Sequence, residues 1–354
     1  MEGVRDNVEV LFGPLLFQRL EPEWRAMFRE SPRAHLTSGF DWCRINWETV
    51  AAGRGDRLLC LLIRRAGRPV LIWPLILSRF RGLWRQVQPL ATLSTEYSHP
   101  LVADVPDAGP IVAEGLHRLR ELCDLVLLPM VRGDSELHEQ ASRNRDFRVL
   151  HSTPTSGALM EDWASFEASI SAAIRNDLSR RQRRLVEQGS VVLTHSVNPG
   201  DSGPAIEWLL EHKRRWLAST GRTSPWLGTE SFRRQLLAAA AHPWNDSGLV
   251  VSALTLNGRF LAAKVLRIDQ ARVEFVLTGM DPDYRRFSPG LILWQSQLRW
   301  ACEHGREVDF RIGQEDYKDA WANVHGQCHV IRGAMSRWGR WYTRLQSAWA
   351  RRRG

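Results

Sequence analysis

The sequence contains very little lysine. Only Lys213, Lys264 and Lys318 are lysines, although lysine and arginine together number 48. Arginine therefore carries almost all of the positive charge, and the formal net charge is +9. A basic protein of this kind permits an anionic partner such as a nucleotide cofactor, tRNA or an acidic membrane surface. The scarcity also marks each lysine as a candidate for a role that arginine does not fill.

Paired cysteines and long hydrophobic runs are also missing. The five cysteines show no CxxC spacing, which argues against a zinc site or a disulfide framework and predicts reduced thiols. No apolar run approaches the roughly 18 residues of a membrane helix; the longest, Val70 to Leu77, contains Pro74. Because the first residues lack a basic segment followed by an apolar stretch, we expect no secretory signal and a cytoplasmic location.

The 354 residues suffice for two domains of ordinary size. In the first part, apolar runs at Arg57 to Arg65 and Pro69 to Ser78 predict a β-hairpin, and amphipathic helices surround it. The Ser/Thr/Pro/Gly run from Ser152 to Gly157 predicts a linker. We therefore predict an α/β (α+β) protein with one domain at 1–155 and a second at 156–354.

The second part begins with a predicted helix over Phe166 to Gln188, which has one apolar face and one arginine-rich face. Asn257-Gly258 joins two apolar runs and is the strongest short signal for a β-hairpin. A third strand, Arg272 to Gly279, follows. Three antiparallel strands thus lead into the segment from Met280 to Gln297.

That segment combines a strand end, a short turn and a helix start. Ser288-Pro289-Gly290 precedes a helical pattern, and Pro289 suits the first turn because its missing N–H is not needed there. Free N–H groups and the helix dipole favour a bound anion, and Arg285 and Arg286 add positive charge. The alternative is an ordinary turn before a core helix.

The run from Asp281 to Gly290 resembles the pyrophosphate-binding loop of GNAT acetyltransferases, which reads roughly Pro-x-Tyr-Arg-x-x-Gly-x-Gly. Arg285 stands at the arginine of this motif and Gly290 at its last glycine. Ser288 replaces the first glycine and introduces a Cβ where the backbone would approach phosphate.

The Ser-Pro-Gly version is similar to the FemAB-like branch associated with bacterial exopolysaccharide and cellulose biosynthesis. The similarity spans about residues 36 to 340 and rests on further short matches: Trp73-Pro74-Leu75, Ser94 to Tyr97, His99 to Leu101, Ser171 to Leu185, Val308 to Gly313, Tyr317-Lys318 and Trp321. The resemblance implies two GNAT-like domains in tandem, with mixed, mostly antiparallel sheets flanked by helices, the second binding the acyl donor.

The resemblance also implies acetyl-CoA or another acyl-CoA as co-substrate and no metal. In this fold the donor lies where two neighbouring strands separate, and its pantetheine arm pairs with the strand backbone. The residues implied in donor binding are Val276, Leu277, Thr278, Arg285, Arg286, Ser288, Gly290 and Leu291.

Acyl transfer requires a deprotonated acceptor and a protonated thiolate leaving group. Glu274 is a candidate base because burial in an apolar strand raises a carboxylate pKa, although on an alternating strand it would face solvent. Asp309 is a second candidate, or a structural partner of Arg311 or Lys318. Tyr317 and Lys318 are candidates for donating a proton or stabilising an oxyanion.

Three residues are candidates for contacting the acceptor. Tyr97 and His99 belong to the first half, where a histidine before proline is also a common turn feature. Arg175 begins an arginine-rich helix face that would suit an anionic acceptor, although most such faces are simply solvated.

The leading hypothesis is an acyltransferase that moves an acyl group, acetyl first among the options, from acyl-CoA to an amine or hydroxyl of a sugar or polysaccharide precursor. A Fem-type ligase that uses aminoacyl-tRNA is the second, because it shares the fold and suits a basic surface. A non-catalytic nucleic-acid-binding or scaffold protein with a degenerate GNAT fold is the third. Peripheral association with an anionic membrane or tRNA is also expected, without a transmembrane segment.

Overall fold

The computed structural model describes residues 6–90, 96–195, 199–244, 247–313 and 315–350. It forms two compact units. Unit 1 comprises the described residues up to Thr153 together with those from Gly326 onward, and unit 2 runs from Pro154 to His325. The predicted boundary near residue 155 lies close to this division. The C-terminal segment differs from the prediction, because it folds with the first unit and not the second.

Unit 1 is a mixed sheet with helices. Its strands follow the order β1-β2-β3-β4-β6-β13, and β5 pairs with β3. The bounds of these strands are Asn7–Phe12 (β1), Arg57–Arg65 (β2), Arg68–Phe80 (β3), Trp84–Pro89 (β4), Leu101–Val102 (β5), Leu125–Arg132 (β6) and Val324–Ala334 (β13). Its helices are Leu15–Arg29 (α1), Phe40–Asn46 (α2), Ala108–Leu122 (α3), Glu136–Arg143 (α4) and Arg337–Ala350 (α11), with short turns at Leu36–Ser38, Trp47–Ala51 and Ala52–Arg54.

The C-terminal strand β13 explains why the end of the chain belongs to unit 1. Its residues from Cys328 to Ala334 pair antiparallel with β6, so backbone hydrogen bonds fix this strand in the first sheet. The predicted linker at Ser152–Gly157 contains the division between the units, which falls after Thr153, but it is a strand and not a loop. These residues belong to β7 (Phe147–Ala158), whose end pairs with β12. Serine and threonine are compatible with a strand when its neighbours supply the ladder.

Unit 2 contains the other strands of the mixed sheet, in the order β7-β12-β11-β10-β9-β8, with β7 from Pro154 onward. The bounds of its other strands are Val191–Thr194 (β8), Gly248–Leu256 (β9), Arg259–Ile268 (β10), Arg272–Met280 (β11) and Glu307–Ile312 (β12). Its helices are Trp163–Ser169 (α5), Ala172–Val186 (α6), Pro199–Thr220 (α7), Glu230–Ala241 (α8), Pro289–Glu303 (α9) and Asp316–Asp319 (α10), and the 3-10 helix η5 spans Pro282–Phe287.

The predicted β9–β10 hairpin is confirmed. Asn257 and Gly258 have φ of 49° and 79°, the left-handed pair that a tight two-residue hairpin requires. The single helix expected over Phe166 to Gln188 is instead two helices. Ile170 is extended, with ψ 138°, and the Ser171 hydroxyl accepts the N–H of Ile174, so a new helix starts there.

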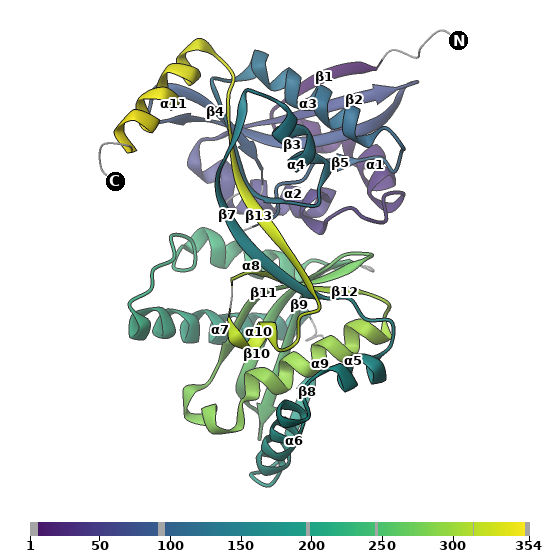
Figure 1. Ribbon diagram of the computed structural model, residues 1–354, viewed down its shortest axis with the longest axis vertical. Helices are drawn as coiled ribbons and strands as arrows, with labels where there is room; N and C mark the ends of the chain where they lie inside the picture. The colour runs from purple at the N-terminus through teal and green to yellow at the C-terminus, as the bar shows by residue number, and fades with distance from the viewer. Residues whose placement is uncertain (1–5, 91–95, 196–198, 245–246, 314, 351–354) are drawn as a thin grey trace. The chain divides into compact units, whose positions relative to one another are not determined.

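Helices cover both faces of the unit 2 sheet (Figure 1). Neighbouring residues of a strand point to opposite faces. Gly279, which pairs with Ala263, lies against Leu209 of α7, whereas Lys264 lies against Trp294 of α9. The α7 and α9 helices therefore pack on opposite faces. None of the helices in the described part of the chain is long and apolar enough to cross a membrane.

Candidate active site

The two central strands of unit 2 separate along their length. Strands β11 and β12 pair in parallel at only three positions, the last of which joins Glu274 to Asp309. Beyond it, β11 stays paired with β10 and β12 stays paired with β7. Val276 is the extra residue of a bulge, because Phe275 and Leu277 pair with consecutive residues of β10. A V-shaped opening therefore begins next to Phe275.

An aromatic cluster lies on the α9 face where the strands part. Phe275 of β11 and Phe310 of β12 follow the last paired position, and their ring centroids are 5.7 Å apart. The Trp294 ring of α9 lies 4.6 Å from each of them. Tyr317 contacts Trp294 edge-on at 5.3 Å. These four rings, which we call the aromatic cluster, line one side of the opening from its closed end outward.

Lys264 of β10 lies beneath this cluster. Its Nζ is 4.1 Å from the ring centroids of both Phe275 and Trp294. The side chain is fully buried, and Nζ has no hydrogen-bond partner among the described residues. Burial lowers the pKa of Lys264 well below its usual value, since desolvation penalises the ammonium more than the two ring faces stabilise it. The Nε1 of Trp294 is also buried and has no partner in this part of the chain.

The predicted anion loop joins β11 to α9. Ser288 has φ 50° and ψ 51°, the left-handed conformation that glycine adopts most easily, and α9 begins at Pro289 as expected. The Leu291 N–H donates to the Ser288 carbonyl at 2.9 Å, so it is already used. The N–H of Gly290 makes no such backbone bond in the described structure, which leaves it as the free donor of this helix start.

A contact from α6 explains why serine occupies the glycine position. Arg181 donates to Ser288 Oγ at 2.7 Å and to the Arg286 carbonyl at 3.3 Å, while its Nε donates to Asp177 at 2.6 Å. The hydroxyl thus ties the loop to α6. One charge-assisted hydrogen bond offsets the cost of a left-handed non-glycine residue, which is about 1 kcal/mol.

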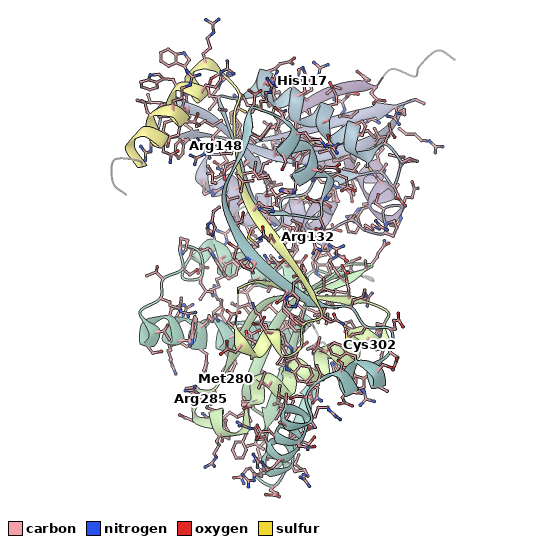
Figure 2. All side chains as sticks on the ribbon, viewed as in Figure 1. His117, Arg132, Arg148, Met280, Arg285 and Cys302 are labelled. Atoms are coloured by element: carbon pink, nitrogen blue, oxygen red, sulfur yellow. The ribbon has the colours of Figure 1, made fainter. Side chains whose placement is uncertain are left out.

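Two other features of the loop suit an anion. Arg285 and Arg286 are exposed at the end of η5, and neither pairs with a carboxylate among the described residues. A Cβ built on Gly290 would meet only Met280, at 3.6 Å from its sulfur, so the backbone here is open to an approaching group. Figure 2 labels Met280 and Arg285 at the same end of unit 2.

The carboxylate of Glu274 points away from the aromatic cluster. It is buried, which rules out the alternative that it faces solvent. Its Oε2 accepts from Arg267 at 2.6 Å and from Arg311 at 2.9 Å, and both arginines are buried as well. Two guanidinium groups share one carboxylate oxygen in a buried ion-pair network. The geometry therefore weighs against Glu274 as the general base and favours a structural ion-pair network.

Asp309 and Lys318 also make local contacts. Asp309 Oδ1 accepts the N–H of Arg311 at 2.6 Å and so supports a left-handed residue with φ 65°. Lys318 is buried, donates to the Ile312 carbonyl at 2.9 Å and pairs with Glu315 at 2.7 Å. One alternative for Asp309 was a structural pairing with Arg311. The two residues do make a structural contact, but it joins the Asp309 carboxylate to the backbone N–H of Arg311 and not to its guanidinium. Lys318 fastens the end of β12 to α10.

Tyr317 is the predicted catalytic residue whose ring belongs to the aromatic cluster. It is 43% exposed while its ring contacts Trp294. Partial burial, with a smaller effect of Glu315, raises the pKa of Tyr317 to about 12. Its phenol therefore stays protonated near neutral pH and is available as a hydrogen-bond donor.

The predicted acceptor residues divide between the units. In unit 1, Tyr97 is buried 5.5 Å from the ring of His35, and His99 Nδ1 lies 2.6 Å from the Pro100 carbonyl, as the turn alternative expected. Ser94 and Thr95 of the same motif lie outside the described residues. In unit 2, Arg175 donates to the Ile170 carbonyl at 3.0 Å, which joins α6 to the preceding turn.

Sequence reasoning marked Lys264 only as one of three lysines, and it gave no site role to Lys264, Arg181 or Trp294. The rarity of lysine and the apolar run around Lys264 were the available signals, and a similar apolar run drew attention to Glu274. Nothing in the sequence distinguishes Arg181 from its neighbouring arginines, because its contact with Ser288 spans 107 positions.

Comparison with known proteins agrees with this geometry. Residues 172–319, which lie within unit 2, match the family described as acetyltransferase (GNAT) domain. No curated protein sequence matches the chain.

Similar folds occur among solved structures. FemX is 10% identical, with a TM-score of 0.62, and the match covers 91% of this chain and 96% of FemX. A conserved protein of unknown function from Bacteroides thetaiotaomicron is 12% identical, with a TM-score of 0.54, covering 92% and 100%. A tandem GNAT protein from the clavulanic acid biosynthesis pathway matches at a TM-score of 0.46 and 12% identity over 93% and 99%.

These findings confirm the predicted α/β fold with GNAT-like neighbours. Unit 2 contains the stretch that matches an acetyltransferase (GNAT) domain, and this match supports an acyltransferase.

Proposed function

We propose that this protein transfers an acyl group from acyl-CoA to an amine or hydroxyl of a sugar or polysaccharide precursor in the cytoplasm. The observation that carries the proposal is the separation of β11 from β12 beyond Glu274 and Asp309, with a free helix N–H at Gly290 near the other end of β11. An extended thioester with a terminal anion fits such an arrangement.

The donor would be held by backbone along most of its length. Val276, Leu277 and Thr278 lie on the strand that borders the opening, and they offer backbone groups to the amides of a pantetheine arm. The pyrophosphate would lie at Gly290, with Arg285 and Arg286 neutralising its charge. Backbone recognition of this kind depends on strand geometry more than on side-chain identity.

The acyl end would lie at the aromatic cluster. Lys264 Nζ and Trp294 Nε1 are two buried donors without acceptors in the described structure, and a carbonyl oxygen is the acceptor that such donors require. A donor aimed at the thioester oxygen stabilises the charge that develops there during acyl transfer. Tyr317 would pass its phenol proton to the leaving thiolate as the C–S bond breaks, and the resulting phenolate would take the proton that the acceptor amine or hydroxyl releases as the new bond to the carbonyl carbon forms.

A Fem-type ligase using aminoacyl-tRNA is the second candidate. The favouring observation is the fold similarity to FemX across nearly the whole of both chains. In both candidate reactions the acceptor attacks an activated carbonyl. The two differ in the anionic donor that carries this carbonyl, which is acyl-CoA in one and aminoacyl-tRNA in the other. Tyr97, His99 and Arg175 stay predicted acceptor contacts, each considered within its own unit, for either candidate.

Calorimetric titration with acetyl-CoA and, separately, with charged and uncharged tRNA tests the proposal. Saturable binding of acetyl-CoA that Gly290→Leu abolishes supports the CoA donor. Salt-sensitive binding of tRNA without any response to CoA would instead establish the Fem-type alternative. Gly228→Leu is the matched control, since Gly228 is also in unit 2 and a Cβ there meets nothing within 4 Å.

A further inference from the structure

The C-terminal helix α11 is firmly attached to unit 1 through its inner face. Ser336 Oγ donates to Asp124 at 2.7 Å, and a Cβ at Gly339 would overlap the Asp124 carbonyl, so only glycine permits this close approach. The Tyr342 ring packs 4.6 Å from Trp84 and 5.6 Å from Phe80. The orientation of the helix on this unit is therefore fixed.

The outer face of α11 is apolar and exposed. Trp338, Trp341 and Leu345 are 69%, 51% and 49% exposed. Their spacing of three and four residues places them on one side of the helix. Figure 2 shows side chains projecting outward from this helix. Large apolar side chains usually stabilise a fold by being buried. A group of three that stays exposed therefore indicates a surface that binds another molecule or a membrane.

A neighbouring turn carries a fourth exposed apolar side chain. Leu83, at the tip between β3 and β4, is 71% exposed. Phe80 and Trp84, on either side of the tip, are the residues that contact Tyr342, so the turn lies beside α11. We call the four side chains Leu83, Trp338, Trp341 and Leu345 the apolar patch.

Arginines border the apolar patch. Residues 337–354 contain six arginines and no aspartate or glutamate. Arg337 and Arg344 are exposed and have no carboxylate partner within the described chain, while Arg340 lies 3.9 Å from Asp146. Nearby, burial lowers the pKa of Arg332, and the positive charges of Arg148 and Arg81 lower it further. Arginines therefore outnumber the two carboxylates, Asp124 and Asp146, that lie against this helix.

We propose that α11 and the Leu83 turn dock unit 1 onto the surface of an anionic lipid bilayer. Tryptophan and leucine on one side of a helix, with arginine alongside, are the composition of helices that lie in the membrane interface. Indole rings favour the headgroup level, and arginines attract acidic headgroups. RNA fits less well, because Leu83 and Leu345 offer no ring on which a base could stack. The proposal is independent of the acyl donor.

Sedimentation with sucrose-loaded vesicles tests the proposal on the full chain. Binding is measured with vesicles of pure phosphatidylcholine and with vesicles that contain a third of phosphatidylglycerol, at low and high salt. The test variants are Trp338→Ser/Trp341→Ser/Leu345→Ser and, separately, Arg337→Glu/Arg344→Glu. The matched controls are Leu159→Ser/Trp216→Ser, which removes exposed apolar groups of unit 2, and Arg180→Glu/Arg183→Glu, which reverses charge on α6. Circular dichroism confirms that each variant is folded.

We expect binding to the anionic vesicles only. The Arg337→Glu/Arg344→Glu variant should bind at least about 25-fold more weakly, since each arginine near such a surface contributes on the order of fivefold. The apolar triple variant should lose at least tenfold, and the controls should bind like wild type. The proposal would be overturned if the apolar triple variant bound vesicles as well as wild type, or if the α6 control lost as much binding as Arg337→Glu/Arg344→Glu. Absence of vesicle binding by wild type at low salt would also overturn it. A further contrary result would be saturable tRNA binding that is lost in the Arg337→Glu/Arg344→Glu variant, together with vesicle binding that no variant changes.

Discussion

The Nζ of Lys264 lies 4.1 Å from the centre of the Phe275 ring, at the point where β11 leaves β12. A buried amine without a hydrogen-bond partner in the described structure destabilises the fold. Such a group is retained where function requires it, and functional sites are often less stable than their apolar replacements. Lys264 therefore allows stability and activity to be separated by experiment.

We predict that Lys264→Met is more stable but less active than wild type. Methionine has a similar length and no charge to desolvate, so the free energy of unfolding should rise by about 1 kcal/mol or more at pH 7. Acyl transfer should fall on the order of 100-fold. Urea unfolding and initial rates measure the two effects. Lower stability together with unchanged turnover would show that Lys264 serves packing alone.

The same residue predicts a pH dependence of stability. Because the folded pKa of Lys264 is depressed, the unfolded chain binds one more proton between that value and about 10.4. Proton binding by Lys264 in the unfolded chain therefore makes the free energy of unfolding of wild type increase as the pH rises from the folded pKa toward about 10.4. Unfolding measured at pH 7 and pH 9.5 should show a larger gain in wild type than in Lys264→Met. Identical pH profiles would contradict the depressed pKa.

Gly290 predicts a loss of binding without a loss of stability. A leucine there has room beside Met280 but covers the free N–H, so affinity for acetyl-CoA should fall at least tenfold. The free energy of unfolding should change by less than about 0.5 kcal/mol. Calorimetry and thermal unfolding measure the two quantities. If Gly228→Leu weakened acetyl-CoA binding as strongly as Gly290→Leu, the lost affinity could not be attributed to the covered N–H at the start of α9.

The contact between Arg181 and Ser288 predicts energetic coupling. Arg181→Met should lower stability by about 1 kcal/mol in wild type. It should cost less in a Ser288→Gly background, where the hydroxyl is gone and the left-handed strain is relieved. A double-mutant cycle should give about 0.5–1 kcal/mol of coupling. Arg183→Met, on the exposed side of α6, should show no coupling with Ser288→Gly. Strictly additive effects of Arg181→Met and Ser288→Gly would show that the hydrogen bond between these residues does not stabilise the loop.

Glu274→Gln separates a structural carboxylate from a catalytic base. Two buried arginines would lose their counter-charge, so the free energy of unfolding should fall by about 3 kcal/mol or more. The turnover of the remaining folded enzyme should change less than tenfold. Surface variant Glu303→Gln, whose partner is Arg299, should cost at most about 1 kcal/mol. Normal stability with turnover reduced on the order of 100-fold or more would restore Glu274 as the base.

Tyr317→Phe tests the proton donor. Removal of the hydroxyl should reduce kcat on the order of 100-fold and leave stability nearly unchanged, because the residue is partly exposed. Since the pKa of Tyr317 is about 12, the wild-type rate should show no loss from tyrosine ionisation up to about pH 10. Tyr284→Phe, a change of the other tyrosine of unit 2, is the control. A wild-type kcat in Tyr317→Phe would exclude the role.

The sequence by itself determined several local elements, among them the β9–β10 hairpin and the turn that starts α9. Asn257-Gly258 specifies its hairpin because few other pairs adopt two left-handed residues, and Pro289 marks a helix start because its ring suits the first turn. The short motif around Arg285 indicated the acyltransferase class. Such features depend on neighbours in the chain, which the sequence displays directly.

Only the tertiary structure decided which side chains meet and where the chain ends are placed. Arg311 reaches Glu274 across 37 positions, and this contact makes the predicted base a member of a buried ion-pair network. Strand β13 returns to β6 of unit 1, and this pairing assigns the last residues to the first unit. Lys264 looks like any strand residue until Phe275 and Trp294 enclose it. Burial and partner identity depend on long-range pairing, which composition and periodicity do not encode.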